Sequence, residues 1–251
     1  MGFYSGPTVV NDSLVFCFDA GSDKCTDADD AVASMRDIAP VAHSSRTDRG
    51  ITGTGNTGNF SFPTNTGASK AIDLSISSYN SANDADDYDN RLTLDDDLYF
   101  ADEDAWSFEF WGKLNSNAVN TYQSLGGPGG TTRWIIQHKG GANSWTIRFR
   151  ENDGTYRTST TQTTSSTEWY QMMFTVAADR TMKQYINGVL ISTHTLTSST
   201  LTINRIMASY SSSTSRYGYE GVMLCCRAYA KELSATEVLK NFNATRGRVG
   251  I

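Results

Sequence analysis

Short hydrophobic runs, alternating or continuous, recur along this chain and are bounded by turn residues, a pattern typical of β-strands. The clearest runs are 14–18, 106–113, 144–150, 169–176 and the segment that starts at Gly221. Asn187 and Gly188 separate the strand-like segments MKQYI and VLISTH. Asn-Gly readily supplies the two positive-φ residues of a type I′ turn, so these segments predict a β-hairpin. The pattern favours an all-β chain.

One helix is predicted, close to the C-terminus. Ser234 and Glu237 have the N-cap and N3 spacing of a capping box. Leu233 and Val238 have the spacing of a hydrophobic staple around the same start. The predicted order at this end of the chain is therefore a strand followed by a short helix.

The alternation also predicts which side chains face away from the core. In WSFEFWGK, the aromatic residues at positions 106, 108 and 110 share one face, and Glu109 and Trp111 share the opposite one. In SWTIRFR, Arg148 and Arg150 likewise face outward. A tryptophan with nearby arginines suits sugar binding, because indole stacks on a pyranose and guanidinium groups donate hydrogen bonds. The alternatives are a bulge that turns Trp111 inward, or a loop or neighbouring subunit that covers this face.

Several of these segments together resemble a known family. They are SLVFCFDAG at 13–21, WSFEFWGK at 106–113, the strand ending in Asn-Gly, and LSATEVLKNFNA at 233–244. They are similar to laminin-G-like domains of the concanavalin A-like superfamily, in the version found in bacteriophage and marine virus structural proteins. The resemblance implies a jelly-roll sandwich of two antiparallel sheets with a short C-terminal helix. It also implies an N-terminal arm at 1–12, a single domain at 13–244 and a tail at 245–251.

Composition and charge exclude some classes of binding partner. The 251 residues carry a net charge of −6 and a pI near 5.0, which argues against nucleic acid, because phosphate binding needs clustered Lys and Arg. No apolar run approaches the roughly 20 residues of a spanning helix, and the first residues lack the order of a signal peptide. We therefore expect no membrane partner and synthesis in a cytoplasm. The resemblance implies a host cytoplasm and localisation in a virion.

The cysteines show no metal-type spacing, and a chain of this length does not need disulfides to fold. They are Cys17, Cys25, Cys225 and Cys226. We expect all of them to be free thiols that act as small hydrophobic residues.

The acidic segment DADDYDN offers several oxygen ligands close together, as calcium needs. Its candidate metal ligands are Asp84, Asp86, Asp87 and Asp89. The segment lacks the glycine and the glutamate of an EF-hand loop. A solvated loop is the alternative interpretation, and no other cofactor is expected.

Catalysis is considered because concanavalin A-like folds include glycoside hydrolases. These enzymes need two carboxylates flanking the scissile bond, which the glucanases of the family carry in an E-x-D-x-x-E run or a close variant. No such run occurs here, and Glu109 has no acidic residue two positions away. We predict that the protein is not an enzyme.

The resemblance favours a virion structural protein, either a capsid decoration or cement protein or a tail or fibre component. Its partners would be other virion proteins and further copies of itself in a homo-oligomer. The candidate assembly contacts are Phe3, Tyr4, Pro7, Arg246 and Arg248, at the two ends of the chain. The alternative function is a lectin-like adhesion module that binds host or environmental glycans.

Overall fold

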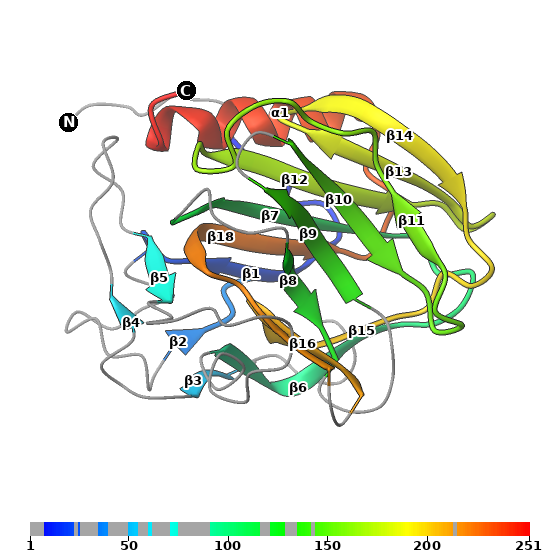
Figure 1. Ribbon diagram of the computed structural model, residues 1–251, viewed down its shortest axis with the longest axis horizontal. Helices are drawn as coiled ribbons and strands as arrows, with labels where there is room; N and C mark the ends of the chain where they lie inside the picture. The colour runs from blue at the N-terminus through cyan, green and yellow to red at the C-terminus, as the bar shows by residue number, and fades with distance from the viewer. Residues whose placement is uncertain are drawn as a thin grey trace.

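In the computed structural model the chain forms two antiparallel β-sheets packed face to face, with a helix near the C-terminus (Figure 1). The structure describes residues 8–22, 25, 35–39, 50–54, 60–61, 71–74, 91–115, 121–128, 135–141, 144–212 and 215–251. The predicted fold class, an all-β sandwich with a short C-terminal helix, is confirmed.

Sheet 1 contains eight strands in the order β14-β13-β12-β7-β18-β5-β4, and β1 pairs with β18 beside this path. The strands are β1 (Leu14–Asp19), β4 (Phe60–Ser61), β5 (Ile72–Leu74), β7 (Trp106–Leu114), β12 (Tyr170–Val176), β13 (Thr181–Ile186), β14 (Val189–Thr195) and β18 (Gly221–Tyr229). The centre of the sheet is β7, which pairs with β12 on one side and with β18 on the other.

Sheet 2 also contains eight strands, in the order β11-β10-β9-β8-β15-β6-β3-β2. They are β2 (Met35–Arg36), β3 (Gly50–Thr54), β6 (Arg91–Phe100), β8 (Thr121–Gly127), β9 (Ile135–Gly141), β10 (Ser144–Arg150), β11 (Tyr156–Thr158) and β15 (Leu201–Ile206). A separate hairpin, β16 (Ala208–Ser212) and β17 (Ser215–Gly218), follows β15.

The core lies between the inner faces of the two sheets. Trp106, Phe108 and Phe110 of β7 are fully buried there, and Ile147 and Phe149 of β10 meet them from sheet 2. The rings of Trp106 and Phe149 have centroids 5.8 Å apart, so the two layers are in direct contact. The inward positions that alternation predicted for these two strands are confirmed.

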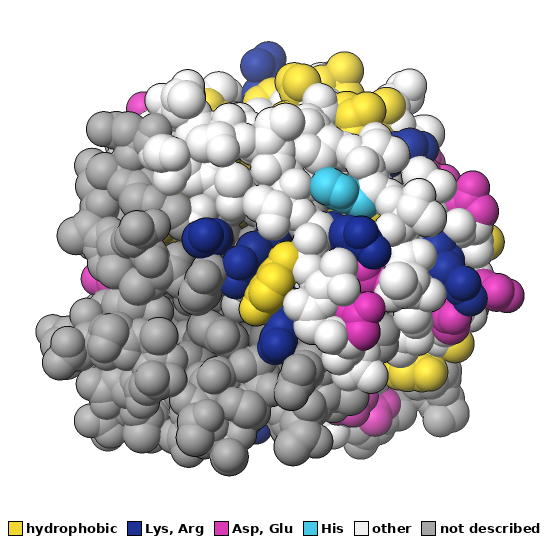
Figure 2. Space-filling view, turned by 45° about the vertical axis from the view of Figure 1, so that its right-hand side comes forward, with side chains coloured by type: hydrophobic (Ala, Val, Ile, Leu, Met, Phe, Trp, Pro, Cys, Tyr) yellow, Lys and Arg dark blue, Asp and Glu magenta, His cyan; other side chains and the backbone are white. Residues whose placement is uncertain are grey.

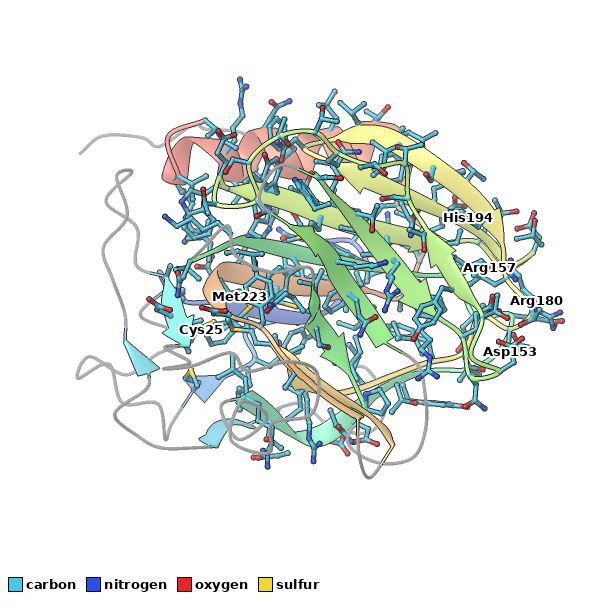
Figure 3. All side chains as sticks on the ribbon, in the orientation of Figure 1. Cys25, Asp153, Arg157, Arg180, His194 and Met223 are labelled. Carbon is cyan, nitrogen blue, oxygen red and sulfur yellow. The ribbon has the colours of Figure 1, made fainter. Side chains whose placement is uncertain are left out.

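Side-chain hydrogen bonds join the β13–β14 hairpin to β11 and the segment that follows it, at one edge of the sandwich. The backbone N–H of Thr160 donates to Ser192 Oγ at 2.9 Å, and Gln184 Nε2 donates to the carbonyl oxygen of Arg157 at 3.0 Å. Figure 3 labels Arg157 and His194 at this edge. The positive charge of Arg157 therefore lies near the His194 imidazole, which matters for its protonation.

The predicted hairpin turn and helix start are both confirmed. Asn187 and Gly188 have φ values of 50° and 78°, as the turn requires. Ser234 caps α1 (Ala235–Thr245) with Glu237 in a complete capping box, and the two staple residues are buried in one cluster. Among the described helices, none is long and apolar enough to cross a membrane.

All four cysteines are buried and unpaired, as predicted. Burial raises the pKa of the Cys17 thiol to about 11, so this thiol stays protonated at neutral pH. These side chains therefore fill the core rather than take part in chemistry.

Candidate functional site

The outer face of sheet 1, where Trp111 lies, is covered by the chain's own C-terminal segment. The Trp111 ring is fully buried and stacks on Phe242 of α1, with ring centroids 5.7 Å apart and planes at 4°. Val249, beyond the helix, is buried in the same cluster. Alternation placed Trp111 on the correct face, but the expectation that it is offered to a glycan is wrong, because α1 covers it.

Glu109 lies beside Trp111 and is equally inaccessible. Its carboxylate accepts hydrogen bonds from Trp111 Nε1 at 2.9 Å and from Gln171 Nε2 at 2.7 Å. Arg227 Nη1 donates to it at 3.1 Å, and Asn241 Nδ2 of α1 donates at 3.2 Å. Glu109 therefore holds the helix to the sheet and is not a glycan contact, which corrects the second prediction for this face.

The C-terminal tail docks on its own domain. Arg248 donates from Nη1 and Nη2 to the two carboxylate oxygens of Asp19, each at 2.7 Å. Burial alone would raise the pKa of Asp19, but the hydrogen bonds and charge of Arg248 hold it below its usual value. Arg248 is thus engaged with Asp19 within the chain, and its role in assembly stays a prediction. Arg246 is exposed and lies over the Phe242 ring, and its role in assembly stays a prediction.

The other predicted site residues lie outside the described part of the chain. They are the assembly candidates Phe3, Tyr4 and Pro7 and the metal candidates Asp84, Asp86, Asp87 and Asp89. Within the described ranges, no three His, Cys, Asp or Glu residues are grouped as a metal site would require.

Arg148 and Arg150 lie on the outer face of sheet 2, on the opposite side of the sandwich from the Trp111 face. Their neighbours in the strand, Ile147 and Phe149, point into the core between the sheets. The predicted surface that combined Trp111 with the two arginines is therefore not one surface. The arginines remain a candidate site of their own.

The guanidinium groups of both arginines lie over the same aromatic ring, that of Tyr156. Tyr156 of β11 is paired with Arg150 across the two strands, and Arg148 is the diagonal neighbour on the same face. The guanidinium carbon of Arg148 lies 4.0 Å from the Tyr156 ring centroid, and that of Arg150 lies 5.3 Å away. Tyr156 is 40% exposed, so part of its ring surface stays available to a ligand.

A buried amide supports this arrangement from the next strand. Gln137 of β9 pairs with Arg148 and is fully buried, and its Oε1 accepts from Arg148 Nε at 2.8 Å. Gln137 Nε2 and the Nε and Nη1 atoms of Arg150 have no hydrogen-bond partner among the described residues. We call Tyr156, Arg148, Arg150 and Gln137 the Tyr156 patch.

More basic residues lie on the same face of sheet 2. By strand alternation these are Lys139 of β9, Arg205 of β15 and Arg91 of β6. Figure 2 shows Lys and Arg side chains grouped around an exposed hydrophobic side chain on this side of the molecule. Basic side chains are therefore concentrated near the Tyr156 patch, although the whole chain is acidic and β6 also presents Asp95 and Asp97 on this face.

The turn before β11 places Tyr156 beside Arg150. Gly154 takes a φ of 93°, Asp153 Oδ1 accepts from the backbone N–H of Thr155 at 2.7 Å, and the N–H of Glu151 donates to Thr155 O at 2.8 Å. Sequence reasoning missed Tyr156 because its strand has only three residues. The Asp-Gly pair after SWTIRFR was the available signal, since it is typical of a hairpin that would bring Tyr156 next to Arg150.

Comparison with known proteins agrees with the sandwich. The family model described as the concanavalin A-like lectin/glucanases superfamily matches residues 86–239, more than half of the chain. The chain therefore belongs to this superfamily. No curated protein sequence matches the chain.

Several solved structures share the fold. The ligand binding domain of botulinum neurotoxin serotype D in complex with N-acetylneuraminic acid has a TM-score of 0.61 at 13% identity, over 93% of this chain and 51% of that one. The binding domain of botulinum neurotoxin DC in complex with SialylT gives 0.59 at 15% identity, over 93% and 51%. The binding domain of Paraclostridial Mosquitocidal Protein 1 gives 0.58 at 16% identity, over 92% and 52%. The chain spans about half the length of these structures, and at such identities the likeness concerns the fold alone.

Proposed function

We propose that this member of the superfamily is a non-catalytic carbohydrate-binding module whose ligand contacts the Tyr156 patch. The observation that most directly supports this proposal is the exposure of Tyr156 on the outer face of sheet 2. Tyr156 is 40% exposed, and the guanidinium groups of Arg148 and Arg150 lie over its ring. An exposed aromatic ring stacks on the apolar face of a sugar, and the surrounding donors bond to its oxygens. The Trp111 face offers no such contact, because α1 covers it.

The non-catalytic part of the proposal rests on the carboxylates. The chain lacks the acidic run that the related glucanases use. Glu109, the glutamate of the central strand motif, is fully buried and bonded to four donors, including Arg227. It is therefore out of reach of a glycosidic oxygen.

The structural neighbours support the ligand class in general terms. Two of them were solved with a sialylated glycan or with sialic acid, and the work on botulinum neurotoxin type C concerns two ganglioside molecules. These ligands belong to proteins about twice as long as this chain. They favour a glycan as ligand but do not identify the site.

The virion role implied by the sequence resemblance stays a prediction, as do its partners, other virion proteins and copies of this chain. It is compatible with the present proposal, since a glycan-binding module can be part of a larger particle. Mass spectrometry of purified virus particles would test it independently of glycan binding.

The test of the proposed function compares two exposed tyrosines of sheet 2. Tyr156→Ala should abolish the signal on a glycan array, because it removes the stacking ring from the Tyr156 patch. The matched control is Tyr99→Ala on β6, which removes another exposed tyrosine from the same outer face, several strands away. Glycans recovered after binding should show no new reducing ends.

Three results would contradict the proposal. The wild-type protein could bind no glycan, Tyr156→Ala could bind as well as wild type, or Tyr99→Ala could be the variant that loses binding. Melting temperatures of both variants should match that of the wild type, so that a loss of signal reports the surface and not the fold.

A further inference from the structure

We infer that the Tyr156 patch selects an acidic saccharide, one that places a carboxylate or a sulfate ester beside the tyrosine ring. This inference rests on the proposed function and specifies its ligand class. It comes from the polar atoms of the patch, which differ from those of a site for neutral sugars in one respect: they are mainly donors.

The polar atoms of the patch that lack a partner all carry hydrogen. Arg150 Nε and Nη1 and Gln137 Nε2 are buried atoms without a hydrogen-bond partner among the described residues. Guanidinium groups have only donors, and the acceptor oxygen of Gln137 is already used by Arg148. These buried atoms are not themselves open to a ligand, but they mark the Arg150 guanidinium as a group that finds no acceptor among the described residues, and such a group binds an anionic oxygen more strongly than a neutral hydroxyl.

The charge of Arg150 is also not paired within the described part of the chain. Its side chain is half-buried, lies over Tyr156 and makes no ion pair with any described residue. The nearby glutamate, Glu151, is already paired with Arg157 at 2.6 Å. A cation that is partly withdrawn from water gains more from an incoming anion than a fully solvated one, because the effective dielectric is lower.

The geometry of the patch suits a compact anion attached to a ring. Gln137 fixes the orientation of Arg148 through its Nε, and the guanidinium carbon of Arg148 lies 4.0 Å from the Tyr156 centroid. The guanidinium of Arg150 is then the group that an anionic substituent can approach while its sugar ring stacks on Tyr156. A nucleic acid is a poorer candidate, because the chain as a whole carries a charge of −6.

The experiment uses oligosaccharide pairs that differ only in charge. Suitable pairs are galacturonate oligomers and their methyl esters, sialyllactose and lactose, and chondroitin sulfate oligomers before and after desulfation. The acidic member of at least one pair should bind about 10- to 100-fold more tightly than its neutral partner, the range expected for hydrogen bonds to a charged group. This preference should weaken as salt is raised from about 0.05 to 0.5 M.

Arg150→Gln should remove the preference, and Arg150→Lys should restore only part of it, because lysine keeps the charge without the planar fork. The matched control is Arg246→Gln, which also removes an arginine that lies over an aromatic ring, at 5.6 Å from the Phe242 centroid and outside the patch. That control should keep the preference. Because Arg150 Nε and Nη1 make no hydrogen bond to any described residue, neither Arg150 variant should lower the melting temperature.

The outcomes separate the inference from the proposed function. Equal binding of the acidic and neutral members in every pair would overturn the inference and leave glycan binding standing. A preference that survives Arg150→Gln would also overturn it. If no glycan in the panel binds, the proposed function fails and the inference fails with it.

Discussion

Replacing Arg227 by methionine should strongly destabilise the domain, because it leaves the Glu109 carboxylate charged and without its counter-ion. Arg227 and Glu109 side chains are 4% and 0% exposed, and their charged atoms lie 3.1 Å apart. Methionine fills a similar volume, so the loss of charge dominates over the loss of packing. Removing one partner of a buried pair costs about 3–5 kcal/mol.

This cost should appear as a fall in melting temperature of about 6–20 °C for a domain of this size. Differential scanning calorimetry and urea unfolding would measure it. The double variant Glu109→Gln/Arg227→Met removes the isolated charge, so it should be less destabilised than the sum of the two single variants.

Two results would refute this reasoning. A cost for Arg227→Met below about 1 kcal/mol would mean that the remaining donors satisfy Glu109 without the cation, as in an exposed pair. Strict additivity in the double variant would mean that the two side chains do not act together. Since Asn241 carries the network into α1, hydrogen exchange of α1 amides in Arg227→Met should rise along with the loss of stability.

Two further predictions concern pH. The pKa of Asp19 is lowered in the folded state, so its ion pair with Arg248 stabilises the fold at pH values above the unfolded pKa of about 3.9, and this stabilisation is lost as pH falls through the folded pKa. In urea unfolding, Arg248→Met should therefore lower the free energy of unfolding by about 2 kcal/mol at pH 7 and by almost nothing near pH 2. An unchanged cost at pH 2 would argue against this ion pair. Burial, and to a smaller extent the charge of Arg157, lower the pKa of His194, so NMR should show the imidazole titrating below about 6.5. The stability of the domain should fall as pH drops below that value, because the unfolded chain then binds the proton more readily. Arg157→Gln should raise the pKa of His194, and an unchanged pKa would exclude the charge effect.

Local signals in the sequence were sufficient for much of the fold. The capping box at Ser234 and the Asn187-Gly188 turn each depend on residues within a few positions of one another, and both are present as predicted. Alternation in β7 and β10 also assigned the inner and outer faces correctly, because successive side chains of a strand point oppositely whatever surrounds them.

The site could not be predicted in the same way, because alternation does not reveal what covers a face. Trp111 is on the outer face as expected, but its cover is Phe242, which is far away in the sequence. Likewise, nothing local shows that Arg148 and Trp111 belong to different sheets. Tyr156 can be recognised as a site residue only from its pairing with Arg150. That pairing depends on the register between β10 and the three-residue strand β11, which is visible only in the folded structure.

The two outer faces consequently have different physical roles. On sheet 1, α1 covers Trp111, and Asn241 of α1 bonds to Glu109 beside its buried ion pair with Arg227, so this part of the face is occupied by the chain's own helix. On sheet 2, the Tyr156 patch keeps an exposed ring, and the buried donors of Arg150 and Gln137 find no partner among the described residues, an arrangement that adds little to stability. The core separates the two regions by the thickness of the sandwich, about 10 Å. Changes at Tyr156 and at Arg227 should therefore be additive in stability, while only the change at Tyr156 should alter the glycan contact directly.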